Sequence, residues 1–282
     1  MSGTLYLVAT PIGNLDDMPP RVAATFGAAD FIAAEDTRVT LKLLNHLGIK
    51  KSLVSYYEHN KATQGSRIVE RILAGETCAL VSDAGSPAIS DPGEDLVRQC
   101  AAAGIPVCAI PGPCAAITAL SISAQATGRF CFEGFLSTAK KSRREHLDSL
   151  EKEQRTMIFY EAPHKLLTTL TDMAEVFGED RPISLCRELT KLHEEVVRTT
   201  LGQAITRYTQ SPPKGEFVLI VAGAPAEKQE LPSETDAAAR VSQLIAEGIS
   251  RKDAIKQTAK ELGLSKNAVY DIALKDSHGD EN

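Results

Sequence analysis

Short apolar runs alternate with amphipathic runs from residue 5 onward. The first five apolar runs are rich in β-branched and other strand-forming residues, and we interpret each as a buried strand: 5–10, 31–34, 53–56, 77–81 and 106–110. Between them, apolar positions recur at helical spacing over 38–47, 63–74 and 93–103. This β-α-β-α order predicts a parallel sheet with helices on both faces.

The alternation resumes in the middle of the chain and predicts a second α/β domain of about a hundred residues. Its expected strands cover 130–136, 156–160, 183–187, 195–199 and 217–221. Its expected helices cover 142–151, 164–177 and 202–208. The pattern leaves open whether the strands at 195–199 and 217–221 are antiparallel.

A polar segment with two prolines, 223–232, follows and has the composition of a linker. Beyond it, helical periodicity covers 235–247, 251–262 and 266–274, with Gly263 ending the second helix and Ser265 capping the third. We therefore predict an N-terminal α/β domain (1–114), a second α/β domain (115–224), a linker (225–234) and a helical domain (235–282).

The composition is that of a globular protein, with 282 residues, 43% hydrophobic and 24% charged. The formal net charge of -6 argues against a generic polyanion binder, so any nucleic-acid contact must come from local basic patches. The 6 cysteines form no C-x-x-C, which predicts buried free thiols in a reducing compartment, and no histidine has metal-ligand spacing.

The chain begins without the basic region of a signal peptide. Its longest apolar stretch, 105–126, is interrupted by Pro106, Pro111, Gly112 and Pro113. We expect a strand, a turn and a buried helix there, not a membrane span, and a cytoplasmic location.

Three loops follow predicted strands: 10–14, 82–93 and 111–115. The run 82–93 contains two Gly, two Pro, two Asp and three Ser, so it continues neither a strand nor a helix. Loops at the carboxyl edge of a parallel sheet bind small ligands, and we expect these three to converge on one site. Neither G-x-G-x-x-G nor G-x-x-x-x-G-K-[ST] is present, which disfavours a dehydrogenase or a P-loop NTPase.

Charged residues follow the second strand at the same edge, and we take Glu35, Asp36 and Arg38 as catalytic candidates. The alternative is that Asp36 or Thr37 only caps a helix. His59, after the third strand, is either a base or phosphate contact or part of a surface turn.

Two basic regions are candidates for RNA contact. The first region is Lys140, Lys141, Arg143 and Arg144, and the second is Lys252, Lys256, Lys260 and Lys266 in a segment with helix-turn-helix spacing. The alternatives are a solvated helix start for the first and a packing or dimerisation appendage for the second. The acidic tail (Asp276, Asp280, Glu281) does not favour nucleic-acid binding.

Several motifs together resemble one known family. They are 34–38 (AEDTR), 82–93 (SDAGSPAISDPG), 111–113 (PGP), 159–165 (FYEAPHK), 187–191 (RELTK) and 214–216 (KGE). This combination is similar to the ribosomal RNA small subunit methyltransferase I family, in the tetrapyrrole-methylase-like superfamily of class III methyltransferases. The resemblance extends from about Leu5 to Leu274.

The resemblance implies two α/β domains with S-adenosylmethionine in the cleft between them, a helix-turn-helix-like C-terminal domain and a homodimer. It implies methyl transfer to the ribose 2′-hydroxyl of a cytidine in the decoding region of 16S rRNA, with the rRNA or small ribosomal subunit as partner. We expect neither a membrane nor DNA as a partner, and we assign no residue as a metal ligand. The implied cofactor contacts, mostly through backbone, are Ile12, Ala84, Gly85, Ser86, Ile89, Cys114, Ala115, Glu161 and Leu189.

Within this framework, Glu35 or Asp36 is the hypothesised proton acceptor and Arg38 a phosphate contact. The alternative functions are carbon methylation of a tetrapyrrole and a ligand-sensing helix-turn-helix regulator. The sequence leaves open which carboxylate is the base, whether free rRNA or an assembled subunit is the substrate, whether a metal assists and whether a second modifying enzyme acts at the same site.

Overall fold

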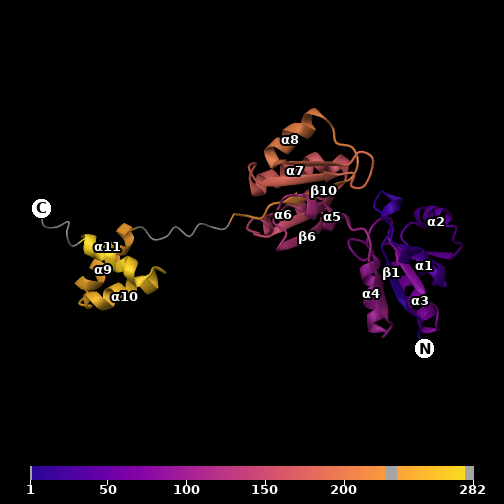
Figure 1. Cartoon of the computed structure of the whole chain (residues 1–282), viewed down its shortest axis with the longest axis horizontal. Coiled ribbons are helices and arrows are strands. Elements are labelled where there is room, and N and C mark those ends of the chain that lie inside the picture. The colour runs from indigo at the N-terminus through magenta and orange to yellow at the C-terminus, as the bar shows by residue number, and fades with distance from the viewer. Residues whose placement is uncertain (1, 226–233, 277–282) are drawn as a thin grey trace. The chain divides into compact units, whose positions relative to one another are not determined.

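The computed structural model describes residues 2–225 and 234–276, and the chain divides into two compact units between Ala224 and Pro225 (Figure 1). The first unit contains two five-stranded sheets. The second contains helices only, within its described residues. Most of the predicted linker, together with Asp280 and Glu281 of the acidic tail, lies outside the described residues.

The first sheet is parallel throughout, as predicted, with strand order β3-β2-β4-β1-β5. Its strands are β1 (Leu5–Val8), β2 (Phe31–Ala34), β3 (Ser52–Ser55), β4 (Cys78–Val81) and β5 (Val107–Ile110). β4, β1 and β5 are neighbours, so the loops that follow them leave the sheet side by side.

Helices cover both faces of this sheet, which confirms the doubly covered arrangement. They are α1 (Pro20–Ala28), α2 (Thr37–His46), α3 (Lys61–Leu73) and α4 (Gly93–Ala102). α3 and α4 pack against one face, and α1 and α2 against the other. The pattern did not predict α1 or the short 3-10 turn η1 (Leu15–Asp17) before it. α1 begins at Pro20, where the missing amide proton costs nothing, and buries Val22 and Phe26 one turn apart.

The second sheet is mixed, with order β6-β7-β10-β8-β9. Its strands are β6 (Phe130–Phe135), β7 (Thr156–Glu161), β8 (Pro182–Arg187), β9 (Glu195–Thr200) and β10 (Phe217–Val221). β6 and β7 are parallel, whereas β10 is antiparallel to β7 and β8, and β9 is antiparallel to β8. β9 and β10 do not pair with each other, because β8 lies between them.

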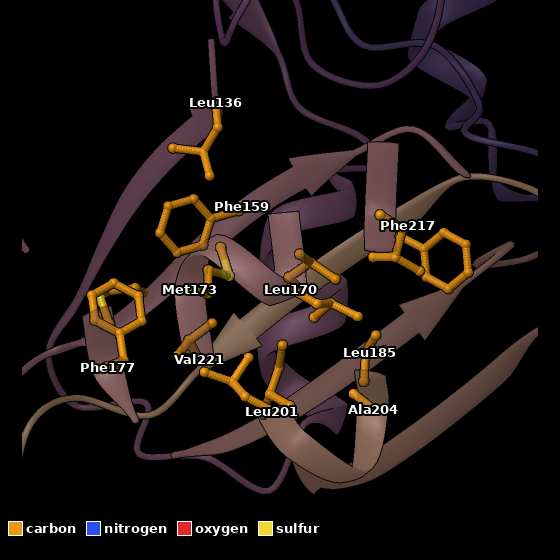
Figure 2. Packing of buried hydrophobic residues seen from close by; sticks show 14 of the residues in the cluster. Leu136, Phe159, Leu170, Met173, Phe177, Leu185, Leu201, Ala204, Phe217 and Val221 are labelled. Atoms are coloured by element: carbon orange, nitrogen blue, oxygen red, sulfur yellow. The ribbon is translucent and has the colours of Figure 1, made fainter. Parts of the chain in front are cut away.

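Helices also cover both faces of the second sheet. They are α5 (Ala115–Ile122), α6 (Lys140–Ser149), α7 (Pro163–Phe177) and α8 (Leu201–Gln210). α6, α7 and α8 bury one face in a large cluster, in which Met173 and Leu170 of α7 lie near Phe159 of β7 (Figure 2). α5 packs on the other face. α6 begins two residues before the predicted start, so Lys140 and Lys141 lie in its first turn.

The second unit is a small helical bundle of α9 (Glu234–Ala246), α10 (Arg251–Glu261) and α11 (Lys266–Asp276), and each helix contacts the other two. Val241, Leu244 and Val269 lie in its core. Ser250 and Ser265 cap α10 and α11 by accepting hydrogen bonds from Asp253 N and Ala268 N, both at 3.2 Å.

None of the helices in the described parts of the chain is long and apolar enough to cross a membrane. The apolar stretch 105–126 forms β5, a turn and α5. All six cysteines are free. Cys78, Cys100 and Cys186 are buried as predicted, but Cys108 is exposed and Cys114 and Cys131 are partly exposed, so the prediction of burial is wrong for these three.

Candidate active site

A cavity of about 430 Å³ lies in the first unit, between the carboxyl edge of the first sheet and residues of the second sheet. The three predicted loops converge here. The loop after β1 pairs with the loop after β4, because Thr10 N donates to Gly85 O at 2.9 Å and Gly85 N donates to Thr10 O at 3.0 Å. Ser86 Oγ donates to Pro113 O at 3.2 Å and joins the loop after β5.

The loop 82–93 adopts a strained, tightly held conformation. Gly85 has φ +79°, and a Cβ there would lie 3.3 Å from Ile12 Cγ2. Ala88 and Ser90 are also left-handed, with φ of 68° and 65°. Asp91 Oδ1 holds this turn by accepting from Ala88 N at 3.0 Å and from Gly93 N at 2.7 Å. Such strain in non-glycine residues clusters at functional sites.

The opposite wall includes the segment 187–191, which is strained in the same way. Glu188 and Thr190 have φ of 51° and 65°, and Leu189 lies between them against the cavity. Lys191 Nζ lies 2.9 Å from both Glu188 Oε1 and Glu216 Oε2, so one ammonium ties this segment to the residue before β10. The ion pairs and the adjoining strands hold Leu189 in place.

Glu161 ends β7 and is only 4% exposed. Its Oε1 accepts from Ala162 N at 2.8 Å, and its Oε2 accepts from Thr169 Oγ1 at 2.6 Å. Glu161 therefore binds both the residue that precedes α7 and a side chain within that helix. Nearby, Tyr160 OH accepts from Ala116 N at 3.2 Å, at the first turn of α5. Burial raises the pKa of Tyr160 to about 12, so its phenol stays protonated.

Every residue predicted to contact the cofactor lines this one cavity. They are Ile12, Ala84, Gly85, Ser86, Ile89, Cys114, Ala115, Glu161 and Leu189. Several other lining residues were not predicted from the sequence: Asp83, Asp91, Phe135, Tyr160, Cys186, Lys191, Glu216, Phe217 and Val218. Most belong to quoted motifs or predicted strands, but no local pattern indicates that they face the cavity.

Of the three catalytic candidates, Glu35 alone lines the cavity. Burial raises the pKa of Glu35, and the nearby carboxylates of Asp83 and Asp91 raise it further. Asp83 Oδ1 accepts from Asp36 N at 3.0 Å and joins the two loops. The cavity therefore favours the protonated form of Glu35 more than water does.

Asp36 caps α2, as the alternative interpretation proposed. Its Oδ1 accepts from Arg38 N at 2.8 Å, and Arg38 also donates through its guanidinium, at 2.6 Å to Oδ2. The hydrogen bonds from the Arg38 side chain lower the pKa of Asp36 to about 2. A carboxylate held in this way is a weak base. The Arg38 side chain is 88% exposed, and His59 is also exposed and lies outside the cavity lining.

The basic residues at the start of α6 separate into two kinds. Lys140 and Lys141 are exposed. Arg143 is buried: its Nε donates to Asp172 Oδ2 at 2.6 Å, and its Nη1 donates to two backbone carbonyls at 3.1 Å. Arg144 pairs with Glu175 and Asp148. The position of Arg143 is at odds with direct RNA contact, because its donors face inward.

The lysines of the second unit are exposed. Lys252, Lys256 and Lys260 recur every four residues on one face of α10, opposite buried Ala254 and Thr258. Lys266 is exposed in the first turn of α11. Among the described residues, no group of histidines, cysteines and carboxylates is arranged to hold a metal ion.

Comparison with known proteins identifies the family. Residues 4–205 match the model of the Tetrapyrrole (Corrin/Porphyrin) Methylases, and residues 232–277 match that of the RsmI C-terminal HTH domain.

Three solved structures share the fold at low sequence identity. CobJ has a TM-score of 0.59 and 19% identity over 79% of this chain and 95% of its own. Diphthine synthase has a TM-score of 0.57 and 12% identity over 78% of this chain and 90% of its own. Uroporphyrin-III C-methyl transferase from Thermus thermophilus, solved with S-adenyl homocysteine, has a TM-score of 0.56 and 13% identity over 77% and 97%.

The fold and the matched model place the chain in the tetrapyrrole methylase family, and it is a methyltransferase. Curated relatives narrow the assignment, and each is named Ribosomal RNA small subunit methyltransferase I. That of Halalkalibacterium halodurans is 50% identical over 96% of this chain and 94% of its own. The relative from Synechocystis is 48% identical over 97% of this chain and 98% of its own. The relative from Escherichia coli O157:H7 is 44% identical over 97% of this chain and 95% of its own. The chain belongs to the ribosomal RNA small subunit methyltransferase I family, which confirms the resemblance and favours it over the alternatives.

Proposed function

We propose that this enzyme transfers the methyl group of S-adenosylmethionine, bound in the cavity, to the ribose 2′-hydroxyl of a cytidine in 16S rRNA, as a cytoplasmic homodimer. One observation carries the proposal. Residues from separate segments that were assigned to the cofactor from sequence alone all line one cavity. The names of the relatives supply the rRNA substrate.

The residues present fit S-adenosylmethionine. Small residues of the loops after β1, β4 and β5 expose backbone to the cavity, and Leu189, Phe217 and Val218 give it an apolar wall. The N-cap residue of α5, Cys114, makes no side-chain cap, and Tyr160 OH accepts from Ala116 N only, which leaves other amides of the first turn for a polar ligand. The lining contains five carboxyl side chains and one ammonium, which suits a cation: Glu35, Asp83, Asp91, Glu161 and Glu216, with Lys191. When bound, the cofactor supplies an electrophilic methyl group on a positively charged sulfur.

Glu35 accepts the proton of the ribose hydroxyl. It lines the cavity, and burial and its acidic neighbours raise its pKa toward the range in which a carboxylate is an effective base. Asp83 and Asp91 belong to the same loop and maintain that shift. The walls of the cavity also hold the methyl donor and the ribose hydroxyl in line. Fixing two reactants in this way lowers the barrier to a displacement by up to about 7–11 kcal/mol.

Exposed lysines contact the RNA backbone outside the cavity. The charge of the lining disfavours phosphate inside it, whereas Lys140 and Lys141 on α6 and the lysine face of α10 are open to solvent. Arg38 is exposed near the same edge and remains a candidate phosphate contact, although Asp36 already pairs with it. Arg143 has a structural role in this proposal.

The test is transfer of radiolabelled methyl from S-adenosylmethionine to unmethylated small ribosomal subunits, free 16S rRNA and a uroporphyrinogen-type tetrapyrrole in parallel. We expect label on RNA that survives nuclease digestion as 2′-O-methylcytidine. Label on the tetrapyrrole alone would refute the rRNA assignment. The ratio of label on subunits to label on free rRNA identifies the preferred substrate.

A further inference from the structure

Phe135 is a large apolar side chain that lines the cavity and is nevertheless 57% exposed. Its ring centroid lies 5.4 Å from that of Tyr160, which lies 5.1 Å from that of Phe132. Among the other apolar lining residues, Leu189, Phe217 and Val218 are nearly inaccessible, whereas Ile89, which is aliphatic, is 48% exposed. Phe135 is thus the accessible end of an aromatic row that continues into the protein.

A β-bulge places Phe135 on this face. Opposite β7, Phe132 aligns with Ile158, Gly134 with Phe159 and Phe135 with Tyr160, so one extra residue, Glu133, is inserted. If Glu133 instead paired with Phe159 in regular register, Phe135 would align with Glu161 and follow the face of Phe159, because side chains alternate along a strand. That face is the core, where the next residue, Leu136, is buried near Phe159 (Figure 2). Bulges near active sites redirect side chains in this way.

The bulge also brings β6 against the strained loop of the first sheet. Gly134 is left-handed, with φ +64°, and a Cβ there would lie 3.1 Å from Ser90 Oγ. Only glycine adopts this conformation without strain and leaves room for Ser90. Phe135 is therefore held beside the loop 82–93, on the same cavity as Glu35.

We propose that Phe135 is the platform on which the base of the target nucleotide stacks, a proposal that rests on the rRNA function above. Of the parts of a nucleotide, only the base has a flat face that matches an exposed aromatic ring. The carboxylates of the lining keep phosphates outside, so the nucleotide enters with its ribose and base. A base must leave its own stack to do so, and an aromatic side chain replaces the lost neighbour.

The kinetic test compares Phe135→Ala with Phe130→Ala. Phe130 is on the same strand and 40% exposed, but lies outside the cavity lining. A base–aromatic stack corresponds to roughly 5- to 150-fold in binding. We expect Phe135→Ala to lower kcat/KM for the RNA by that factor with S-adenosylmethionine affinity unchanged, Phe135→Tyr to restore it, and Phe130→Ala to match the wild type.

A spectroscopic test follows from the absence of tryptophan in this chain. Phe135→Trp introduces a single tryptophan, which can be excited selectively over the six tyrosines, and we expect unmethylated 16S rRNA to quench it while the emission of Phe130→Trp is unaffected. Wild-type kinetics for Phe135→Ala would overturn the proposal. Weakened cofactor binding with unchanged RNA kinetics would also overturn it and assign Phe135 to the cofactor. If the wild type labels no RNA, the proposed function fails and the stacking role fails with it.

Discussion

The buried ion pair between Arg143 and Asp172 gives the sharpest test of how the basic start of α6 is used. Both side chains are only 10% exposed, and Nε and Oδ2 are 2.6 Å apart. Asp172→Ala would leave a buried guanidinium without its counter-charge, which costs about 3–5 kcal/mol. For a unit of this size, 1 kcal/mol corresponds to roughly 2–4 °C in Tm, so we expect Tm to fall by about 6–20 °C.

The double variant Arg143→Met/Asp172→Leu removes both charges and keeps most of the volume. Its stability should lie close to that of the wild type, because desolvation of the pair offsets most of its attraction. The two carbonyls that Arg143 also binds belong to exposed Ser137 and Thr138, so water replaces those bonds. Urea titrations of the wild type, both single variants and the double variant give the coupling energy directly. If the free energy of unfolding of Asp172→Ala lies within 1 kcal/mol of the wild-type value, the ion pair does not have this structural role.

The same double variant separates structure from RNA contact. We expect its RNA affinity to be unchanged, whereas Lys140→Ala/Lys141→Ala should weaken binding and flatten its salt dependence. Two lost phosphate contacts reduce the slope of log K against log salt by roughly 1.4–1.8. Filter binding across a salt series measures both. Loss of RNA affinity in the stable double variant would show that Arg143 reaches RNA.

Three further changes test the cavity. Glu35→Gln should lower kcat by about 10²–10⁴-fold without lowering Tm, because it removes the base and also relieves repulsion among carboxylates; undiminished turnover in single-turnover assays would eliminate Glu35 as the base. Asp83→Asn keeps the acceptor for Asp36 N but removes a charge that raises the pKa of Glu35. Because activity rises as Glu35 ionises, we expect the acidic limb of the pH–rate profile to move to lower pH. An acidic limb at the wild-type pH would contradict this. Lys191→Met should weaken S-adenosylmethionine binding about 10-fold by releasing the strained segment around Leu189, whereas Lys191→Arg should keep the wild-type affinity. Equal affinities of Lys191→Met and the wild type by calorimetry would show that the segment keeps its conformation without the ion pairs.

The convergence of the three loops could be predicted from sequence because parallel strands end at a shared edge. The sequence did not predict α1, whose apolar face is short and begins at paired prolines. It also did not indicate that Arg143 is buried, because its partner Asp172 lies on α7 and a run of four basic residues has the pattern of a solvated surface.

The wall formed by the second sheet was harder to predict. The face to which Phe135 points depends on the bulge at Glu133, and the bulge lies where Gly134 approaches Ser90 of the loop that follows β4. No periodicity within β6 contains that information. The glycine in this strand was the only local signal, since a glycine inside a strand often marks a bulge.

The acidic lining has a consequence for turnover. Methyl transfer leaves the cofactor as a neutral thioether, and on the proposed chemistry the proton lost by the ribose neutralises Glu35 at the same time. The attraction between the lining and its ligand therefore weakens in the step that forms the product. The carboxylates thus distinguish fresh cofactor from spent cofactor by charge alone, and they favour release of the product over its retention as an inhibitor.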